Sequence, residues 1–567
     1  MIAKVTPLIR LPSSTDVFDY FVPDELRQSV LPGSLVRIPF RASKVAGVVL
    51  DVAPAQERTG FRARPVDSVI GSEPVLTASQ LALIQEFSAY YFVTRGSVAR
   101  LMVPERPERA SPRSPSLVRR GRGGGNDVPF SVSSSQLLQL KKAAASISSA
   151  RFLTIQDVSS FVWLLLHLIK QGEQSQLLVL VPTLDMIDGI AGSVHKMCSD
   201  ELAVIHSRLS LGQYWNAYQN IMAGSARVIL STRQGVFLPI RENSHIIFFD
   251  ATSEDFKQYD QHPKYDSRIV ASWLASITES KLLFASSSEI IAEQRTTPLL
   301  FPPARGQKLS VSLVDMKNEM SRRDFSAIAG ATLEAIQETL SQHKKAVVIA
   351  LREEPPLNPP LGKGGRRGGV SVKSILEILT QELKNCKVSA SEEQFQVLVA
   401  TPRVLEGLKL SSERSSLGLL VCASIEPMLA IPDYRSPERV YYRLKHWQML
   451  AQELGFGRII LQSYSPDSLA VRAFAYGEFE AFAADELASR RELSYPPFSK
   501  LVKLSYRGKD GKAAGELKRR LPNATGPFTD HSNRQSLLIK LPPNAQLPDL
   551  WDVSPDWAID RDPENVL

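Results

Sequence analysis

The sequence predicts an α/β protein with two parallel sheets in tandem, preceded by a β-rich domain and followed by a small α+β domain. Two long stretches alternate short apolar runs with helical segments, as buried parallel strands and their crossover helices do. The chain before them carries alternating apolar residues, which are typical of half-buried strands. At about 100–200 residues per domain, a chain of 567 residues fits roughly three to five domains.

The N-terminal domain is expected over residues 1–105. The runs at 35–40 and 45–52 indicate two strands joined by the turn "RASK". A helix is expected directly after Thr77, whose hydroxyl can accept a hydrogen bond from the first helical turn. The apolar residues at helical spacing are Leu81, Ile84, Phe87 and Tyr91. This domain is therefore predicted to be a compact β-rich unit closed by a helix.

Two segments rich in Pro, Gly and Arg interrupt the globular pattern. They cover residues 106–128 and 353–371, and they share the order of Pro, Leu, basic and Gly-Gly positions. Neither has enough apolar residues to build a core, so we expect disordered basic segments. Two interpretations stay open: inserted spacers, which we favour, and tethers whose cations bind phosphate.

The two α/β domains are expected over residues 129–303 and 304–482. The first contains the apolar strands "LLVLVP", "AVIHS", "RVILST", "HIIFFD" and "KLLFASS", and the second contains "AVVIALR", "FQVLVATPR", "LGLLVCAS" and "RIILQSYS". Two such domains in succession are typical of the RecA-like lobes of helicase and translocase motors. Residues 483–567 begin with a charged helix and are expected to form the small α+β domain.

A motor of this kind needs a glycine-rich phosphate loop ending in Gly-Lys-Ser/Thr after the first strand. The residues at that place are "RFLTIQDVSS", with Asp157 about where the Lys should be, and a carboxylate there repels phosphate. The strand "HIIFF" delivers Asp250, but Ala251 follows where a Glu would activate water. Between Arg443 and Arg458 no arginine is present to reach a γ-phosphate. The ATP site is therefore expected to be degenerate at all of these positions, and neither ATP nor Mg²⁺ is expected as a cofactor.

Composition narrows the class of protein further. The net charge of +8 and the pI near 9.2 favour a polyanionic partner such as nucleic acid. The three cysteines, Cys198, Cys386 and Cys422, lie far apart and support neither a disulfide framework nor a zinc site. The longest apolar run, "FVWLLLHLI", is shorter than the about 18 residues that a membrane span needs. With no signal-peptide pattern at the start, a cytoplasmic location is expected.

Several motifs, taken in order, resemble those of one family. The N-terminal domain has "VFDYFVPDEL", "PGSLVRIPF" and "SAYYFVTRGSVARLMVPE". The α/β domains have "VIHSRLS", "VILSTRQGVFLP", "DFKQYDQHPKYDSR", "LVATPRVLEG", "PDYRSPERVY" and "ILQSYSPDS", and "ADELASRRELSYPPFSKLVKLSYRGKD" follows them. In this order, over nearly the whole length, the chain resembles the primosomal protein N′ family, the replication-restart helicase PriA. The resemblance also has departures. Members of the family carry a winged-helix domain and a zinc region at the two places where this chain has its spacers, and the C-terminal domain of this chain looks shortened.

The resemblance implies a binding site for DNA in the N-terminal domain, where the family holds the 3′ end of a nascent strand. The residues that it assigns to this site are Phe18, Asp19, Tyr20, Arg37, Arg41, Lys44 and Arg64. An aromatic ring can stack on the terminal base, a carboxylate can accept a hydrogen bond from a free 3′-hydroxyl, and the cations suit phosphates. A Phe and a Tyr around an Asp are also typical of a core pair, so this alternative stays open for the two aromatic residues.

These observations lead to the hypothesis of a pseudohelicase. Such a protein would bind forked DNA with a 3′ end in replication restart or repair, without ATP-driven unwinding. Two alternatives remain: an active ATP-dependent 3′–5′ DNA helicase with unrecognised nucleotide contacts, and a protein-interaction scaffold that no longer binds DNA. The expected partners are DNA and other primosome or single-strand-binding proteins, and no membrane is expected.

Overall fold

The computed structural model divides into two compact units. It describes residues 1–567 except 10, 12–15, 55–62, 106–133, 146–150, 156, 172–174, 292–298, 302–308, 322–325, 355–369, 392–393, 408–415, 509, 531, 554–555 and 567. The first unit holds the described residues of Met1–Arg119, Leu168–Phe284 and Ser494–Leu567, and the second holds those of Arg120–His167 and Ala285–Leu493. The predicted linker at 106–128 and most of the spacer at 353–371 lie outside the described residues.

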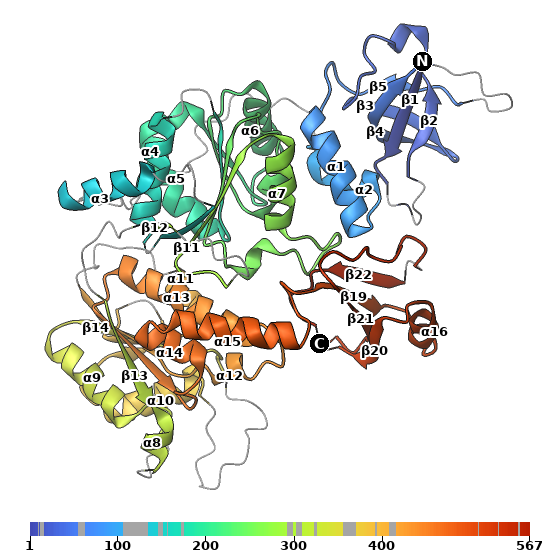
Figure 1. Cartoon of the computed structure of the whole chain (residues 1–567). Coiled ribbons are helices and arrows are strands. Elements are labelled where there is room, and N and C mark those ends of the chain that lie inside the picture. Colours follow the sequence, from blue (N-terminus) through green and yellow to red (C-terminus); the bar gives the residue numbers. More distant parts are fainter. Residues whose placement is uncertain are drawn as a thin grey trace. The chain divides into compact units, whose positions relative to one another are not determined.

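The chain starts with an antiparallel sheet in the order β2-β1-β4-β3-β5 (Figure 1). Its strands are β1 (Ile2–Pro7), β2 (Phe18–Phe21), β3 (Leu35–Phe40), β4 (Ser43–Ala53) and β5 (Ser68–Val69), with a short 3-10 helix η1 (Asp24–Leu26) after β2. The strands alternate because successive side chains point to opposite faces of a sheet. One face is apolar and forms a core around Ala3, Val5, Tyr20, Val36, Ile38 and Val49.

Two helices complete the N-terminal part, α1 (Ala78–Tyr91) and α2 (Arg95–Met102). The predicted start of α1 is confirmed: Thr77 and Gln80 form a capping box. In α2, Gly96 lies against β1, and a Cβ at this position would overlap the carbonyl oxygen of Pro7. A glycine is therefore required for α2 to approach the strand so closely.

The second sheet is parallel, and its described strands follow the order β12-β6-β11-β10-β7-β9-β8. They are β6 (Phe152–Ile155), β7 (Leu177–Leu180), β8 (Leu202–Ile205), β9 (Val228–Ser231), β10 (His245–Phe249), β11 (Lys281–Ser286) and β12 (Leu299–Phe301). The helices of this region are α3 (Ser134–Ala145), α4 (Val158–Gln171), α5 (Leu184–Cys198), α6 (Leu211–Ala223) and α7 (Ser267–Ile277), with 3-10 turns η3 (Ser199–Glu201), η4 (Arg233–Phe237) and η5 (Glu254–Phe256).

The third sheet is also parallel, in the order β13-β18-β17-β14-β16-β15. Its strands are β13 (Ser310–Asp315), β14 (Lys345–Ile349), β15 (Val388–Ser389), β16 (Val397–Ala400), β17 (Leu417–Cys422) and β18 (Arg458–Ser463). Its helices are α8 (Met316–Ser321), α9 (Gly330–Ser341), α10 (Val372–Glu382), α11 (Pro402–Gly407), α12 (Glu426–Leu429), α13 (Ser436–Leu454), α14 (Leu469–Tyr476) and α15 (Phe479–Glu492).

The two parallel sheets share one topology. When the described strands of each sheet are numbered in chain order, both sheets have the spatial order 1-6-5-2-4-3. The second sheet has an additional seventh strand, β12, which lies beside its first strand, β6. The predicted fold class is therefore confirmed: two parallel α/β sheets follow an antiparallel N-terminal sheet.

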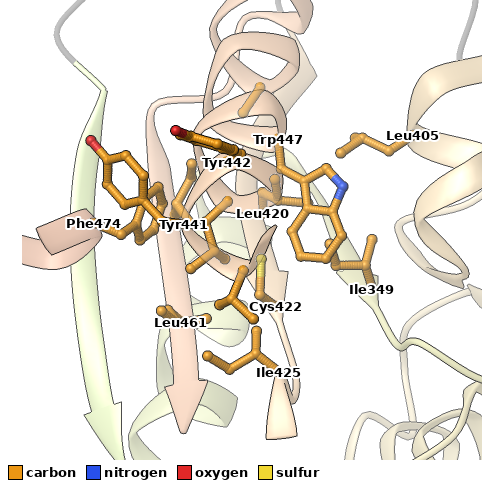
Figure 2. Close-up of a cluster of buried hydrophobic side chains, with 14 of the residues drawn as sticks. Ile349, Leu405, Leu420, Cys422, Ile425, Tyr441, Tyr442, Trp447, Leu461 and Phe474 are labelled. Carbon is orange, nitrogen blue, oxygen red and sulfur yellow. The ribbon is translucent and has the colours of Figure 1, made fainter. Parts of the chain in front are cut away.

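The core of the second unit is densely packed around α13. Figure 2 shows Tyr441, Tyr442 and Trp447 of this helix beside Leu420 and Leu461 of the neighbouring strands. All of these side chains are buried. The segment between Arg443 and Arg458, where arginines would be expected in a motor, contributes to this apolar core instead.

The C-terminal part forms a small antiparallel sheet in the order β20-β21-β19-β22. Its elements are β19 (Lys500–Tyr506), α16 (Ala513–Arg520), β20 (Ala524–Thr529), β21 (Gln535–Leu541) and β22 (Trp557–Arg561). The helix packs on the apolar face of the sheet, around Val502, Leu504, Leu517, Leu537 and Ile539. The prediction of a small α+β domain is confirmed.

A buried charged cluster joins three parts of the first unit. Lys257, which follows η5, donates a hydrogen bond of 2.7 Å to the Arg561 carbonyl and lies 3.1 Å from the Asp560 carboxylate. The Tyr90 hydroxyl of α1 donates to Asp562 at 2.7 Å, and the Arg561 guanidinium donates to the Tyr90 carbonyl at 2.8 Å. The end of β22 is therefore bonded both to the N-terminal helix and to the segment after β10.

Candidate nucleic-acid interface

The aromatic residues of β2 lie on opposite faces of the N-terminal sheet. Tyr20 is 4% exposed, and its hydroxyl donates a hydrogen bond of 3.0 Å to the Pro39 carbonyl. Phe18 shares that face and packs edge-on against Phe40, with 5.2 Å between the ring centroids. Phe21 points to the other face and is exposed. Phe18 and Tyr20 thus contribute to the core face, and the exposed ring of this strand belongs to Phe21.

Asp19 lies on the exposed face together with Phe21. The β1–β2 register places Asp19 opposite Lys4, and the two side chains form an ion pair of 3.3 Å. Lys4 also lies opposite Asp51 of β4. Because the side chains of Lys4 and Asp19 are 48% and 35% exposed, the Asp19 carboxylate can still reach a ligand from solvent.

Two of the four candidate cations share this face. Arg37 and Lys44 occupy alternating positions of the β3–β4 hairpin, on the side opposite to the core residue Ile38. Arg37 is exposed, and Lys44 is paired with Asp67 at 2.5 Å. The arrangement places one carboxylate and two cations on the same surface.

The other two candidate cations meet at the hairpin end. The Arg64 guanidinium donates a hydrogen bond of 3.3 Å to the Arg41 carbonyl, and the Arg41 guanidinium lies 5.8 Å from the centroid of the Phe40 ring. Burial raises the pKa of the Tyr20 phenol, and the Arg64 guanidinium offsets part of this rise. These cations therefore extend the basic surface around the rim of the sheet.

Salt is expected to weaken DNA binding at this surface strongly. If all four cations contact phosphates of a single strand, the slope of log K against log salt is about −2.8, and affinity falls about 50-fold between 50 and 200 mM salt. Arg37→Gln should make the slope less steep by about 0.7. Fluorescence anisotropy with a labelled strand measures it, and Arg27→Gln, an exposed arginine after η1, is the matched control. A slope near zero would contradict phosphate contacts.

The start of α4 is the first of the positions where a motor would bind nucleotide. β6 ends at Ile155 and α4 begins at Val158, so the connection is too short for a glycine-rich loop. Asp157 is 1% exposed and accepts hydrogen bonds from Ser160, at 2.7 Å from the amide and 3.0 Å from the hydroxyl. Its carboxylate therefore caps the helix where a phosphate would otherwise bind.

A second carboxylate reaches the same helix end. Glu453 of α13 accepts a hydrogen bond of 3.3 Å from the Ser159 amide, and it is 6% exposed. The first amides of a helix attract anions because its N-terminus carries a partial positive charge. Here the chain supplies both anions itself. Sequence reasoning did not identify Glu453, because a contact between residues so distant in the chain leaves no local pattern.

Asp250 and Ala251 follow β10 in a bent and buried segment. Asp250 is 4% exposed and has a left-handed φ of +56°, which Asp tolerates better than most residues. The Thr252 hydroxyl donates to its carboxylate at 3.5 Å, and Arg268 donates to the Ala251 carbonyl at 3.1 Å. Ala251 has a methyl group, which cannot accept a proton from water.

The arginines of the family-like motifs in the α/β regions are engaged in local contacts. Arg233 donates to the Asp255 carbonyl at 3.3 Å. Arg435 pairs with Glu438 at 3.2 Å, and Arg439 lies 3.5 Å from an oxygen of Asp433. These contacts hold each motif to its own unit.

Two other features are absent from the described part of the chain. Its His, Cys, Asp and Glu side chains form no group of three or more that could hold a metal ion. Among the helices of the same residues, none combines the length and apolar character that crossing a membrane requires. The cysteines are free thiols, of which Cys198 and Cys422 are buried.

Comparison with known proteins shows a similarity to PriA. Residues 8–104 match the family model of the 3′ DNA-binding domain (3'BD) of PriA. The replication restart protein PriA of Treponema pallidum is 23% identical over 560 residues, which cover 85% of this chain and 84% of that protein. These matches support the interpretation of the chain as a member of the PriA family.

Other matches cover less of each chain. The PriA of Synechocystis is 23% identical over 421 residues, which cover 59% of this chain and 50% of that protein, so the match spans half of that relative. Among solved structures, RecG bound to a three-way DNA junction matches with a TM-score of 0.37 and 14% identity, over 64% of this chain and 47% of that chain. All seven candidate DNA contacts lie within the region that matches the PriA 3′ DNA-binding domain.

Proposed function

We propose that this PriA-family chain binds forked DNA with a 3′ end during replication restart or repair, and that it does so without ATP-driven unwinding. The match of residues 8–104 to a 3′ DNA-binding domain supports the DNA-binding part. The observation that carries the second part is the pair of carboxylates, Asp157 and Glu453, at the N-terminus of α4. A protein with this role acts where the replicating DNA lies, and we propose the cytoplasm.

The chemistry of Asp19 favours a free 3′-hydroxyl. A carboxylate accepts a hydrogen bond from a hydroxyl, and a hydrogen bond to a charged group contributes about 1.5–3 kcal/mol. A 3′-phosphate at the same place would bring two anions together, which is repulsive. The neighbouring cations, Arg37 and Lys44, suit the phosphates that precede the terminal nucleotide.

The chemistry at the start of α4 disfavours a nucleotide. The amides of Ser159 and Ser160 already donate hydrogen bonds to the buried carboxylates of Glu453 and Asp157. A triphosphate would have to break these hydrogen bonds to bind at the helix N-terminus. At the second position, the residue after Asp250 lacks a group that can activate water. The parallel sheets themselves are intact, because their strands are held by apolar packing that does not depend on nucleotide (Figure 2).

A single titration tests the proposal. A labelled fork with a 3′-hydroxyl is compared with the same fork carrying a 3′-phosphate, and ATP hydrolysis is followed in parallel. We expect at least about 10-fold tighter binding of the hydroxyl end and hydrolysis at the level of the blank. Asp19→Asn should remove most of the discrimination, whereas Asp51→Asn, on the same sheet face, should retain it.

Each part of the proposal has its own contradicting result. Equal affinities for the two forks would refute recognition of the 3′ end. DNA-stimulated ATP turnover would refute the pseudohelicase and favour an active helicase. Absence of any DNA binding would favour a protein-interaction scaffold.

A further inference from the structure

Glu453 stands out because it is a buried acid in an unfavourable position of its own helix. It lies in the last turn of α13 and is 6% exposed. The C-terminal end of a helix carries a partial negative charge, so cations are favoured there and carboxylates are not. None of the residues in this last turn is basic. A buried carboxylate is costly unless another group compensates it, so Glu453 depends on contacts outside α13.

One compensating group is the start of α4. The Ser159 amide donates a hydrogen bond of 3.3 Å to the Glu453 carboxylate, and both residues belong to the second unit. The N-terminal end of a helix carries a partial positive charge, and the first turn of α4 contains no acidic residue of its own. The carboxylate of one helix is therefore bound at the positive end of another.

Apolar packing fixes both partners of this contact. Phe161 and Leu165 of α4 are fully buried. Trp447 and Leu454 of α13 belong to the buried core of the second unit, in which Figure 2 shows Trp447. The amide and the carboxylate are therefore held in place by their surroundings, and little conformational entropy is lost when they bond.

The two partners come from the two places with which a motor holds the phosphates of its nucleotide. Phosphates bind at the amides of a helix N-terminus, and an arginine stabilises the charge of the γ-phosphate. Glu453 lies in the segment between Arg443 and Arg458, where the arginines of a motor would be expected. A helix N-terminus and an arginine are both positive, so they need a phosphate between them. A carboxylate can bind the helix N-terminus directly.

A further donor lies at the same helix end. Ser159 is 3% exposed, and its hydroxyl has no hydrogen-bond partner among the described residues. Buried hydroxyls normally have such a partner. An anion at this helix end can therefore accept from a hydroxyl as well as from an amide.

We propose that Glu453 is an internal anion that takes the place of a γ-phosphate and keeps α13 joined to the start of α4 without nucleotide. In a nucleotide-driven switch, the contacts of the γ-phosphate are lost on hydrolysis. Here the anion is part of the chain, so the contact is permanent. This inference rests on the proposed function without ATP-driven unwinding, and it adds the residue that holds the second unit in one state.

The test is hydrogen–deuterium exchange of the full chain, measured on peptides that cover the start of α4. In the unmodified protein, ATP with Mg²⁺ should leave this exchange unchanged. In Glu453→Ala it should become about 10- to 100-fold faster, as expected for the loss of a hydrogen bond to a charged group. Acetate supplies a carboxylate of the same charge and should slow the exchange of this variant again. Chloride at equal ionic strength should not.

Two further variants separate the role of charge from a loss of packing. Glu453→Gln keeps the size of the side chain and can be measured even if Glu453→Ala does not fold. A neutral hydrogen bond is weaker than a charged one, so its exchange should lie between those of the unmodified protein and Glu453→Ala, without a response to acetate. Leu454→Ala removes the neighbouring side chain, which is 5% exposed. It should lower the urea midpoint, and acetate should not restore it.

The outcomes distinguish this inference from the proposed function. If ATP with Mg²⁺ slows exchange at the start of α4 in the unmodified protein, a nucleotide binds there and the proposed function fails first. If ATP has no effect and acetate does not slow the exchange of Glu453→Ala, Glu453 is not an internal anion, and the proposed function stands. Equal exchange in Glu453→Gln and the unmodified protein would also refute a role for the charge.

Discussion

Replacing Lys257 by Ala is expected to lower the free energy of unfolding of the first unit by about 3–5 kcal/mol. The Lys257 side chain is 0% exposed and supplies one hydrogen bond and one ion pair to the end of β22. Removing it leaves the Asp560 carboxylate and the Arg561 carbonyl in the interior without that cation, and an uncompensated buried group costs more than the pair contributes. Urea unfolding of the full chain, followed by tryptophan fluorescence, measures the loss.

The matched control for this change is Lys264→Ala. Lys264 contacts the same carboxylate at the same distance of 3.1 Å, but its side chain is 28% exposed. Water can replace it, so we expect a loss below about 1 kcal/mol. Equal losses for Lys257→Ala and Lys264→Ala would show that burial does not set the strength of this contact.

Replacing Arg490 by Ala is expected to destabilise the second unit by a similar amount, about 3–5 kcal/mol at neutral pH. Arg490 of α15 is 6% exposed and bonds two buried carboxylates, Glu438 of α13 at 2.9 Å and Glu486 at 3.1 Å. Without the guanidinium, the Glu486 carboxylate loses the cation that it contacts, and Glu438 keeps its ion pair with Arg435. The shift of the urea midpoint measures the effect, and Arg472→Ala, from an exposed ion pair with Glu478, should leave it unchanged.

The pH dependence of this variant provides a second readout. Burial raises the pKa of Glu438, but Arg435 and Arg490 outweigh burial and bring the pKa below its usual value. Its contribution to stability is therefore present above the unfolded pKa and is lost as pH falls through the folded value. Burial raises the pKa of Glu486 above its usual value, although the Arg490 guanidinium offsets part of this rise. The ionised form of Glu486 in the folded protein is therefore stabilised by Arg490. The difference between the protein and Arg490→Ala should shrink toward acid pH, because protonated carboxyls need no cation. A loss that is independent of pH would show that Arg490 acts through packing alone.

The strand that ends in Asp250 is retained for reasons that do not involve a nucleotide. Phe248 and Phe249, just before it, are both fully buried, and removing a buried aromatic side chain costs about 3–5 kcal/mol. Asp250 itself adopts a left-handed turn and accepts a hydrogen bond from Thr252. The strand and the turn are therefore needed for folding even without ATP hydrolysis. The side chain of the residue after Asp250 is not needed for folding, so Ala is tolerated there.

The sequence by itself determined the layout of this protein. Apolar runs located the central strands of both parallel sheets, because a strand buried on both faces must be apolar along its length. Thr77 located the start of α1, because capping is a local interaction between residues three apart. The order of motifs predicted a resemblance to the PriA family, and the match of residues 8–104 and the similarity to the Treponema relative support this resemblance.

Only the tertiary structure decided which side chains meet. In the motif "VFDYF" the sequence could not say which aromatic ring reaches solvent, because that depends on which face of β2 is packed, and the packing partners come from distant strands. Glu453 lies 294 residues from the Ser159 amide that it accepts from, so no local pattern could reveal it. Strand and helix formation follow from short-range spacing, whereas faces, ion pairs and the filling of a helix end follow from contacts that exist only after the chain has folded.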